Sequence, residues 1–283
     1  MRWLVVGAKG MLGQDVTALL AERGEHVEGI DREEIDIADP QACLGVADGF
    51  DVVMNCAAYT AVDAAEADEA TAFAINAVGA ANLARAARNA GARTVQISTD
   101  YVFDGHAAQP YAEDAPLAPR SAYGRTKGAG EWAVRAENPD HLVVRTAWLY
   151  GAHGGCFPKT IVRVARERGE LEVVDDQVGQ PTWTVDLADL VHRLVSTGAR
   201  AGTYHGTSSG QTSWHGFAQA AVAAAGMDPG IVRTTTSEGY VRAAPRPSYS
   251  VLDHTALRAV SVEPIDDWAR RWAEASETVL LPG

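Results

Sequence analysis

Short apolar runs alternate with longer amphipathic segments through the first half of the chain. The strand-like runs are Arg2–Val6, His26–Ile30, Asp51–Met54, Thr94–Ser98 and His141–Arg145. The segments with helical spacing between them are Gly10–Arg23, Glu66–Asn89 and Ser121–Glu137. Short β-branched strands separated by helices are typical of a parallel sheet that is covered on both faces. The pattern therefore predicts an α/β fold with a Rossmann-type, doubly wound parallel sheet.

A glycine-rich segment joins the first predicted strand to the first helix. It reads Gly7-Ala8-Lys9-Gly10-Met11-Leu12-Gly13, which is the spacing G-x-x-G-x-x-G. Its glycines allow a tight turn close to a phosphate, and free N–H groups at a helix start favour a pyrophosphate. The motif predicts a dinucleotide site; a plain strand-to-helix turn is the alternative. The expected cofactor contacts here are Gly7, Gly10, Met11, Leu12 and Gly13.

Two neighbouring residues give opposite indications about the cofactor's ribose. Asp31 ends the second strand, where a carboxylate usually accepts a hydrogen bond from the 2′-OH of NAD. Arg32 follows at once and could hold the 2′-phosphate of NADP. The sequence leaves NADPH or NADH open, with a slight preference for NADPH. Strand-end residues with no cofactor role are the alternative.

Other cofactor contacts are expected around the ends of the second and third strands. Small side chains after the third strand would let the cofactor lie close, and an asparagine inside a helix is unfavourable unless it supports a site. These expected contacts are Asp36, Ile37, Ala57, Ala58, Tyr59 and Asn76.

Tyr123 and Lys127 have the spacing Y-x-x-x-K on a predicted helix. Because positions i and i+4 share a helix face, both side chains should point into one site. An ammonium beside a phenol favours the phenolate, so we expect the pKa of Tyr123 to be lowered. Tyr123 would then be a usable acid or base. Thr99 ends the fourth strand, at the edge where ligands bind in such sheets. An exposed helix face is the alternative for the Tyr–Lys pair.

The second half of the chain has a looser pattern. Helical segments are expected at Phe157–Arg168, Val185–Thr197, Ser213–Ala225 and Pro264–Thr278, with few strands between them. We expect residues 1–150 to form a dinucleotide-binding Rossmann domain. Residues 151–283 should form mainly a smaller mixed α/β substrate-binding lobe. Parts of 180–200 and 235–255 are expected to return to the first domain.

Composition argues against several other classes of protein. The 283 residues include 24 Lys and Arg against 37 Asp and Glu, a net charge of −13, which does not suit a nucleic-acid polymer or a membrane surface as partner. Three scattered cysteines and eight histidines without HxxxH or HxH spacing predict neither a disulfide framework nor a zinc site. No apolar run reaches about 18 residues, so we expect a cytoplasmic protein without a membrane span. Lysine is scarce: Lys9, Lys127 and Lys159 are the three, and the sequence gives Lys159 no role.

Longer blocks resemble the extended short-chain dehydrogenase/reductase superfamily and, within it, the dTDP-4-dehydrorhamnose reductase family. The more specific blocks are Asn55–Asp63, Ser98–Gly105, Ser121–Lys127, Arg145–Gly151, Asp176–Thr182 and Arg246–Asp253. The resemblance covers nearly the whole chain. It implies NAD(P)H-dependent reduction of the C4 ketone of dTDP-4-dehydro-6-deoxy-L-mannose to dTDP-L-rhamnose, so the expected partner is a dTDP-sugar.

The same resemblance implies roles for individual residues. Tyr123 would donate a proton, Thr99 would bond the carbonyl oxygen, and Lys127 would bind the ribose and tune Tyr123. The residues expected at the substrate are Thr60, Val62, Thr99, Tyr101, Tyr123, Trp148 and Arg246, the last at the phosphates. Some members of the family dimerise through Mg²⁺ held by interface carboxylates. Asp15 could supply one, but Val185 stands near the expected second ligand, so we expect no functional metal and a monomer or homodimer.

Other functions remain open to different degrees. A ketoreductase of a related dTDP-deoxysugar would share every catalytic residue. A 4,6-dehydratase would need a glutamate where Tyr101 stands, and the family blocks disfavour a 4-epimerase. A non-catalytic NADP-binding regulatory subunit would not need Tyr123, Lys127 and Thr99, which are all present.

Overall fold

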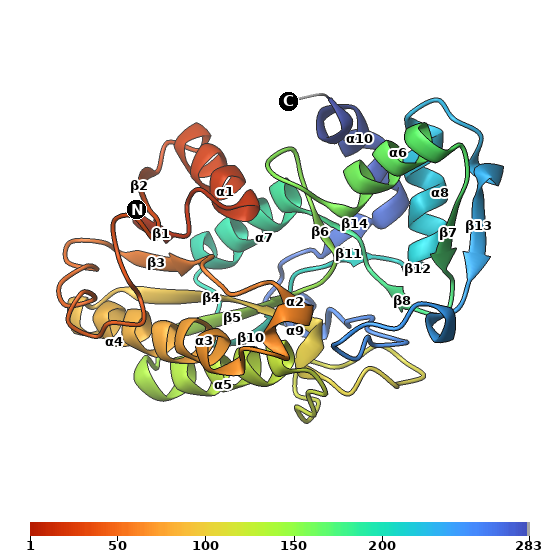
Figure 1. Ribbon diagram of the computed structural model, residues 1–283. Helices are drawn as coiled ribbons and strands as arrows, with labels where there is room; N and C mark the ends of the chain where they lie inside the picture. The colour runs from red at the N-terminus through yellow and green to blue at the C-terminus, as the bar shows by residue number, and fades with distance from the viewer. Residues whose placement is uncertain (282–283) are drawn as a thin grey trace.

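The computed structural model describes residues 1–281, and its centre is a six-stranded parallel sheet (Figure 1). The strands are β1 (Arg2–Val6), β2 (His26–Ile30), β3 (Val52–Asn55), β4 (Arg93–Thr99), β5 (His141–Thr146) and β10 (Gly202–His205). Their order is β10-β5-β4-β3-β1-β2, and every neighbouring pair is parallel. The predicted Rossmann-type doubly wound sheet is confirmed. Its strand order reverses between β1 and β3, where ligands bind in such sheets.

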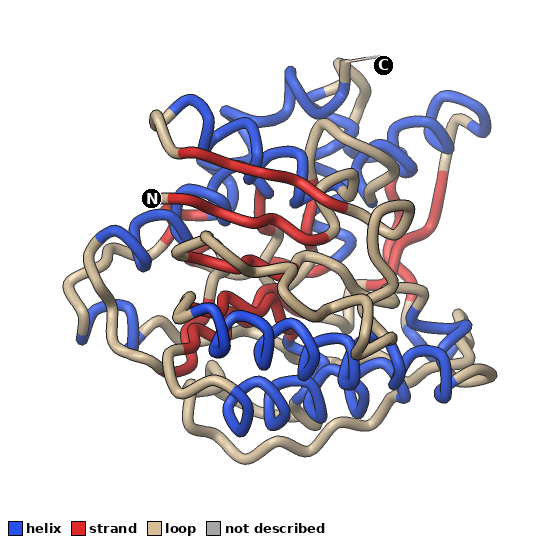
Figure 2. The backbone as a smooth tube through the Cα atoms, turned by 90° about the vertical axis from the view of Figure 1, so that its left-hand side faces the viewer, coloured by secondary structure: helices blue, strands red, loops and turns tan. Residues whose placement is uncertain are grey.

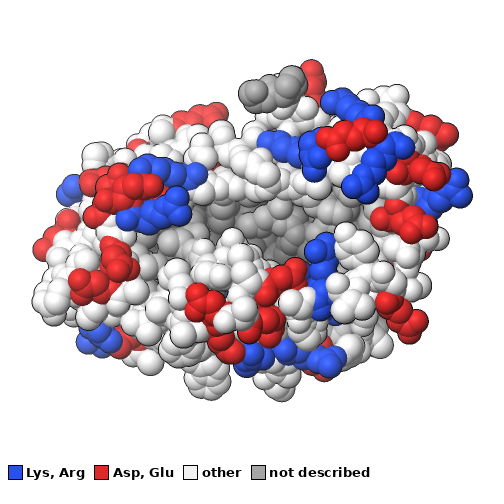
Figure 3. Space-filling view, viewed as in Figure 1, with Lys and Arg blue, Asp and Glu red and all other residues white. Residues whose placement is uncertain are grey.

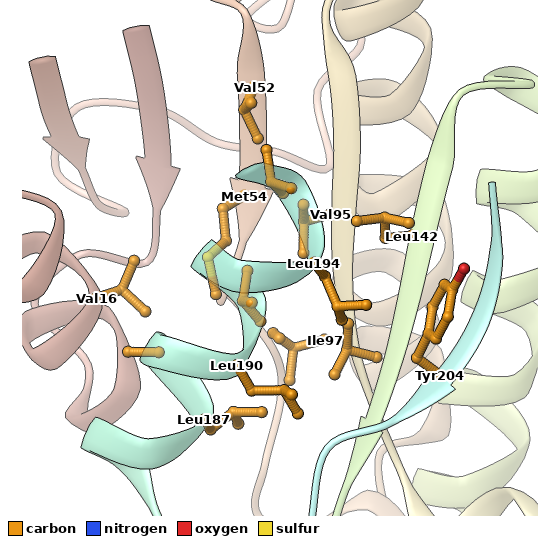
Figure 4. Close-up of a cluster of buried hydrophobic side chains, with 14 of the residues drawn as sticks. Val16, Val52, Met54, Val95, Ile97, Leu142, Leu187, Leu190, Leu194 and Tyr204 are labelled. Carbon is orange, nitrogen blue, oxygen red and sulfur yellow. The ribbon is translucent and has the colours of Figure 1, made fainter. Parts of the chain in front are cut away.

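Helices cover both faces of this sheet, as Figure 2 shows. The helices α1 (Met11–Glu22) and α7 (Thr184–Ser196) contact each other on one face, and α4 (Ala80–Ala90) and α5 (Ala122–Glu137) contact each other on the other. Side chains alternate along β1. Trp3 and Val5 belong to the first core, which lies under α1 and α7, while Leu4 and Val6 belong to a second core under α4. Since β1 is buried on both faces, it reads as a continuous apolar run rather than an alternating one. Figure 4 shows the first core, where Leu187, Leu190 and Leu194 of α7 meet the strands.

The stretch predicted as one helix over Glu66–Asn89 is broken into shorter elements. The structure has α2 (Val62–Ala65), α3 (Glu69–Phe73), a π-helical segment η1 (Ala74–Gly79) and then α4. Asp68 caps α3 by accepting a hydrogen bond from the Thr71 amide at 3.2 Å. The π segment contains Asn76, whose side chain bonds to neighbouring segments. Such segments often occur at functional sites. The helical period alone could not reveal the break.

The remaining elements surround a second group of aromatic side chains. The helices are α6 (Phe157–Arg168), α8 (Trp214–Ala224), α9 (Thr255–Ala259) and α10 (Trp268–Leu280), with short turns η2 (Asp100–Val102), η3 (Pro229–Ile231) and η4 (Ser237–Gly239). The strands are β6 (Leu149–Tyr150), β7 (Leu171–Val174), β8 (Val178–Gly179), β9 (Thr182–Trp183), β11 (Ser208–Ser209), β12 (Thr212–Ser213), β13 (Val232–Thr235) and β14 (Ile265–Asp267). Tyr150, Phe217 and Trp272 lie at the centre of the core formed by α6, α8 and α10.

Two expectations about the second half are wrong. Strands are frequent there, but most have two to four residues and form two-stranded pairs, too short for a visible alternation. The sixth strand of the main sheet, β10, was missed because Gly202-Thr203-Tyr204-His205 has no apolar run. The last helix begins at Trp268 rather than Pro264, because Ile265–Asp267 pairs with Ser208–Ser209.

Several segments of the second half lie against the main sheet. The helix α7, the strand β10 and Leu257 of α9 all belong to the core around β1, β3, β4 and β5. The aromatic core of α6, α8 and α10 lies beyond the carboxyl ends of the strands (Figure 1). We refer to the elements around that aromatic core as the second lobe. No helix within residues 1–281 is long and apolar enough to cross a membrane.

Removing apolar volume from the first core should cost stability. Leu190 is fully buried between α7 and the strands. Leu190→Ala should lower the free energy of unfolding by about 2–5 kcal/mol, because it removes buried methyl groups and leaves a cavity. Urea titration followed by circular dichroism measures the change. The matched control Leu44→Ala, at a side chain that is 66% exposed, should shift it by no more than about 0.5 kcal/mol. Equal effects of the two substitutions would contradict the assigned core.

Candidate active site

The carboxyl ends of the strands open onto a hollow in the protein surface. Figure 3 shows this hollow near the middle of the face, between the sheet and the second lobe of Figure 1. A pocket on one side is lined by Tyr101, Ser121 and Arg246, among others. The glycine loop, the end of β4 and the start of α5 all lie at this edge of the sheet. This edge therefore carries the glycine loop, Thr99 and Tyr123, which the sequence selects for cofactor and substrate.

The glycine loop is held in a shape that larger residues could not adopt. Gly7 has φ of 82°, and a Cβ there would stand 2.6 Å from the Ala57 amide nitrogen. A Cβ on Gly13 would stand 2.1 Å from the Gly7 carbonyl oxygen. Gly10 precedes α1, and no side chain caps this helix start. Its N–H groups are therefore available to a pyrophosphate, and the loop fits the dinucleotide predicted from its sequence.

Asp31 and Arg32, the residues expected beside the ribose, have different partners and exposure. Both carboxylate oxygens of Asp31 accept hydrogen bonds from backbone amides, Oδ2 from Lys9 and Oδ1 from Arg32, each at 2.8 Å. Asp31 thus ties the glycine loop to the end of β2. The Arg32 side chain is 89% exposed and lies 3.5 Å from Glu33. The Lys9 ammonium contacts Glu33 at 2.9 Å and Glu34 at 3.2 Å.

Asn76 joins two sides of the expected cofactor site. Its Oδ1 accepts from the Tyr59 amide at 2.8 Å, and its Nδ2 donates to the Tyr59 carbonyl at 3.2 Å and to Thr126 Oγ1 at 3.0 Å. Asn76 is 2% exposed, so it holds the segment after β3 against α5. Ala57 and Ala58 lie in that segment and are half-buried. Their small side chains leave room beside the glycine loop.

Asp36 and Ile37, two of the expected cofactor contacts, differ in burial. Ile37 is buried in the core between β1, β3 and α4. Asp36 is exposed and accepts a hydrogen bond from the Ala38 amide at 2.9 Å.

Tyr123 and Lys127 lie one turn apart on α5, as their spacing predicts. Ser121 caps this helix by accepting from the Gly124 amide at 3.1 Å, which fixes the turn that carries Tyr123. The Lys127 ammonium is buried and donates to the Ile97 carbonyl of β4 at 2.6 Å. Thr99 lies near Tyr123 at the end of the same strand. The structure therefore brings together the three residues that the sequence selected.

The expected lowering of the Tyr123 pKa is wrong. Burial raises the pKa of Tyr123 to about 12, and it outweighs the contact with the Thr99 hydroxyl, which lowers it. Burial also lowers the pKa of Lys127 to about 8, against the nearby Glu131 carboxylate, which raises it. Near neutral pH Tyr123 is thus a neutral phenol and Lys127 remains mostly charged. A phenol in this state can donate a proton but cannot act as a resting base.

A buried carboxylate that the sequence prediction missed lies behind these residues. Glu131 is 1% exposed and forms a two-pronged pair with Arg145, Nε to Oε1 and Nη2 to Oε2, each at 2.8 Å. It also accepts from Ser98 Oγ at 2.7 Å and from Arg135 at 2.9 Å. Burial alone would raise its pKa, but the Arg145 guanidinium holds that pKa below the ordinary value. The signal was available, because Tyr123, Lys127 and Glu131 repeat at intervals of four on one helix.

Asp100 is a second missed carboxyl group in direct contact with a predicted residue. Thr99 Oγ1 donates to Asp100 Oδ1 at 2.9 Å and accepts from the Tyr101 amide at 3.2 Å. Asp100 is 3% exposed. The Ser250 hydroxyl lies near enough to lower the pKa of Asp100, but within residues 1–281 its geometry does not make a hydrogen bond to Oδ2. Burial raises the pKa of Asp100 to about 6, so its charge changes close to the neutral range.

The residues expected at the substrate differ in burial and in their partners. Tyr101 packs edge-on against Tyr123, with ring centroids 5.6 Å apart. Val62 and Trp148 are half-buried, and Thr60 is exposed. Arg246 pairs with Asp63 at 2.8 Å, and Asp63 also accepts from the Ala244 amide at 3.1 Å.

The Asp63 carboxylate was missed as a partner of Arg246. It ties the segment around residue 244 to the start of α2. The Arg246 guanidinium is therefore already engaged by a carboxylate before any phosphate binds.

The structure supplies a role for Lys159. Its ammonium donates to the carbonyls of Ala152 and Gly154, the second at 3.1 Å. These carbonyls belong to the loop after β6, and a Cβ on the neighbouring Gly151 would stand 3.2 Å from the Met11 side chain of the glycine loop. Lys159 therefore fixes a loop that lies against the expected cofactor site.

Asp15, the residue considered for Mg²⁺, has another partner: it is buried and accepts a hydrogen bond from Thr184. Asp186, which follows Val185, forms a two-pronged pair with Arg271 at 2.8 Å. Among residues 1–281, no three His, Cys, Asp or Glu side chains gather so as to hold a metal ion.

Comparison with known proteins agrees with this arrangement. The family model described as the RmlD substrate binding domain matches residues 1–280. A dTDP-4-dehydrorhamnose reductase from Streptomyces griseus is 47% identical, over 97% of this chain and 92% of its own length. The chain belongs to the dTDP-4-dehydrorhamnose reductase family. This membership makes it an NAD(P)H-dependent oxidoreductase.

Other proteins similar to this chain include a solved structure and a second reductase. The dTDP-4-dehydrorhamnose reductase from Bacillus anthracis, solved in complex with NADP, has a TM-score of 0.93 and 36% identity, covering 97% of this chain and 98% of that one. A dTDP-4-keto-6-deoxy-D-glucose reductase from Streptomyces niveus is 46% identical, over 97% of this chain and 96% of its own length. In this reductase family, the loop at Gly7–Gly13 and the group Thr99, Tyr123 and Lys127 fit a nicotinamide dinucleotide.

The raised pKa of Asp100 should make stability depend on pH. Because its folded pKa lies above the ordinary 3.8, its contribution is fully present below about pH 4 and is lost as pH rises through about 6. Between those limits wild type should lose about 2–3 kcal/mol relative to Asp100→Asn. Urea unfolding of both proteins at about pH 4 and about pH 7 gives the difference. A difference that stays constant with pH would contradict the assignment.

Proposed function

We propose that the protein reduces the C4 ketone of dTDP-4-dehydro-6-deoxy-L-mannose to dTDP-L-rhamnose, with Tyr123 as the proton donor. The observation that carries the proposal is the meeting of Tyr123, Lys127 and Thr99 at the edge of the sheet that also carries the glycine loop. The relatives from Streptomyces griseus and Bacillus anthracis, both named dTDP-4-dehydrorhamnose reductases, support it. NADPH is the proposed reductant, with NADH as the alternative.

The chain's own groups account for the proton and the charge. The bound nicotinamide would supply the hydride. Tyr123 starts as a neutral phenol, so it can give its proton to the ketone oxygen as negative charge develops there. Thr99 stands beside it, so that two hydroxyl groups can meet one substrate oxygen. The Lys127 cation, fixed by the Ile97 carbonyl, favours the phenolate that the transfer leaves behind.

Binding of the two phosphorylated molecules must rely on local groups, because the chain as a whole is acidic. The uncapped start of α1 would take the cofactor's pyrophosphate. Arg32 would take a 2′-phosphate, since its side chain is exposed. Its contact with Glu33, at 3.5 Å, is long enough to be exchanged for a phosphate. Arg246 would take the sugar nucleotide's phosphates, in exchange for or together with its pair to Asp63. Val62, Tyr101 and Trp148 would line the sugar pocket.

A related reductase activity is the second candidate. The Streptomyces niveus protein, named as acting on a dTDP-4-keto-6-deoxy-D-glucose, is almost as similar to this chain as the rhamnose-pathway relative. Both activities need the same proton donor and differ in the configuration of the sugar ring. A panel of the two dTDP-4-keto sugars with NADPH separates them. A non-catalytic regulatory subunit is disfavoured by the complete set of Thr99, Tyr123 and Lys127.

Removing the phenolic hydroxyl of Tyr123 should slow the reaction strongly but leave the cofactor bound. Tyr123→Phe should lower kcat by about 10²-fold or more, because the alkoxide loses its acid. Turnover is followed by NADPH absorbance with the dTDP-4-keto sugar, and cofactor binding by fluorescence titration. The matched control Tyr240→Phe changes an exposed ring and should retain full activity. Near-normal turnover by Tyr123→Phe would remove it from the acid role, and no turnover by wild type would reject the proposed reaction.

Arg32 should decide the preference between the two cofactors. Arg32→Ala should raise the KM for NADPH about tenfold, since a charged contact to the 2′-phosphate is lost. The KM for NADH should change by less than about twofold, as that cofactor has no such phosphate. Steady-state kinetics with both cofactors test this. Equal changes for NADPH and NADH would show that Arg32 does not read the phosphate.

A further inference from the structure

Trp148 presents its indole from a strained backbone. Its φ is 49°, in the left-handed region that bulky residues seldom adopt. The Thr182 amide donates to its carbonyl at 3.2 Å, and the next two residues pair with Thr182 and Trp183. Strained residues of this kind persist only where the surroundings hold them, and they gather at ligand sites. The strain therefore marks the direction of this side chain as a feature that the fold maintains.

The position of Trp148 relates it to the predicted catalytic group. Thr146 of β5 is the register partner of Thr99 in β4. Trp148 follows Thr146 by two residues, so it leaves the sheet at the edge where Thr99 lies. The ring remains partly exposed. This is the place from which a flat side chain could contact a sugar held beside Thr99 and Tyr123.

Two residues from the second half of the chain fix the plane of the indole. Trp214 stacks on it with ring centroids 3.5 Å apart and planes inclined by 9°. Gly179 provides the space at its edge, because a Cβ there would stand 2.5 Å from Trp148 Cε2. Any side chain at position 179 would displace the indole or itself be displaced.

The second lobe holds Trp214 in turn. Trp214 is the first residue of α8, and the preceding Ser213 caps this helix by accepting from the Gly216 amide at 3.0 Å. Thr212 is the register partner of Gly179 in the β8–β12 pair. Trp214 directly follows β12, so the stacking ring and the space at Gly179 are positioned by the same pair of strands. Phe157, the first residue of α6, packs against Trp214 with centroids 4.4 Å apart. The plane of Trp148 is thus set by the lobe and not by β5 alone.

We propose that Trp214 is a positioning residue for the substrate's hexose ring and acts by holding the Trp148 indole in one plane. The inference rests on the proposed function, in which Trp148 lines the sugar pocket. The C–H face of a sugar suits a flat aromatic surface. An indole that is already fixed loses little rotamer freedom when the sugar binds, whereas a free one must be ordered at that step. Trp214 therefore contributes to affinity without touching the reacting atoms.

Kinetics of four variants test this role. Trp214→Ala should raise the KM for the sugar nucleotide about tenfold, with kcat and the KM for NADPH within about twofold of wild type. Trp214→Phe keeps an aromatic face and should restore most of the affinity. In a Trp148→Ala background, Trp214→Ala should have no further effect, because the two residues act as one unit. Additive effects, or a fall in kcat with an equal change for NADPH, would overturn the proposal.

A spectroscopic measurement tests the stack without substrate. Two indoles stacked in contact couple their strong electronic transitions and give a paired positive and negative band in far-ultraviolet circular dichroism. Trp148→Phe, Trp214→Phe and Gly179→Ala should each abolish this couplet. The control Trp132→Phe, at a ring that is 67% exposed on α5, should retain it.

The two measurements separate failure of this inference from failure of the proposed function. A couplet in a protein that does not reduce the dTDP-4-keto sugars would reject the function while leaving the stack in place. Turnover by a wild type without the couplet would reject the stack, and with it the role of Trp214.

Discussion

The buried Glu131 carboxylate is the interaction on which the catalytic edge of the sheet depends. It joins three elements: α5, which carries it, β5 through Arg145, and β4 through Ser98. Taking a carboxylate and a guanidinium out of water is costly. The cost is offset by further bonds: Ser98 and Arg135 donate to the carboxylate, and the Glu113 carbonyl accepts from the guanidinium. Removing one member would leave an unpaired buried charge, at a cost of about 3–5 kcal/mol. Through these bonds Glu131 links α5, which carries Tyr123 and Lys127, to β4, which ends at Thr99.

The rest of the site is built by the same means, through side chains that bond to the backbone of neighbouring segments. Asn76 holds Tyr59 against α5, Asp31 holds the glycine loop, and Lys159 closes the loop after β6. Each bond fixes a segment whose own sequence is too irregular to form a helix or strand. Groups that are fixed before the ligand arrives need no reorganisation during the reaction. The segments of the expected cofactor and substrate sites are thus placed mainly by hydrogen bonds from side chains to backbone.

Much of the fold could be predicted from the sequence because many helices and strands follow from hydrophobic patterns within short segments. The first five strands and the helices α1, α5 and α6 follow from runs and periods that each lie within about sixteen residues. The break in the helix at Asn76 and the strand β10 could not be read in this way. The first depends on bonds to Tyr59 and Thr126, and the second on pairing with a strand about 60 residues earlier. In both cases a distant partner overrides a weak local preference.

The kind of chemistry could be predicted from local sequence patterns. The glycine spacing, the Tyr123–Lys127 interval and Thr99 at a strand end predict a nicotinamide-dependent reductase site. The charge state and orientation of these groups depend on the fold. Burial raises the pKa of Tyr123 instead of lowering it, Asp63 engages Arg246, and Trp214 fixes the plane of Trp148. Charge state and orientation depend on which distant atoms exclude water or stand in contact, and spacing along the chain does not specify those atoms.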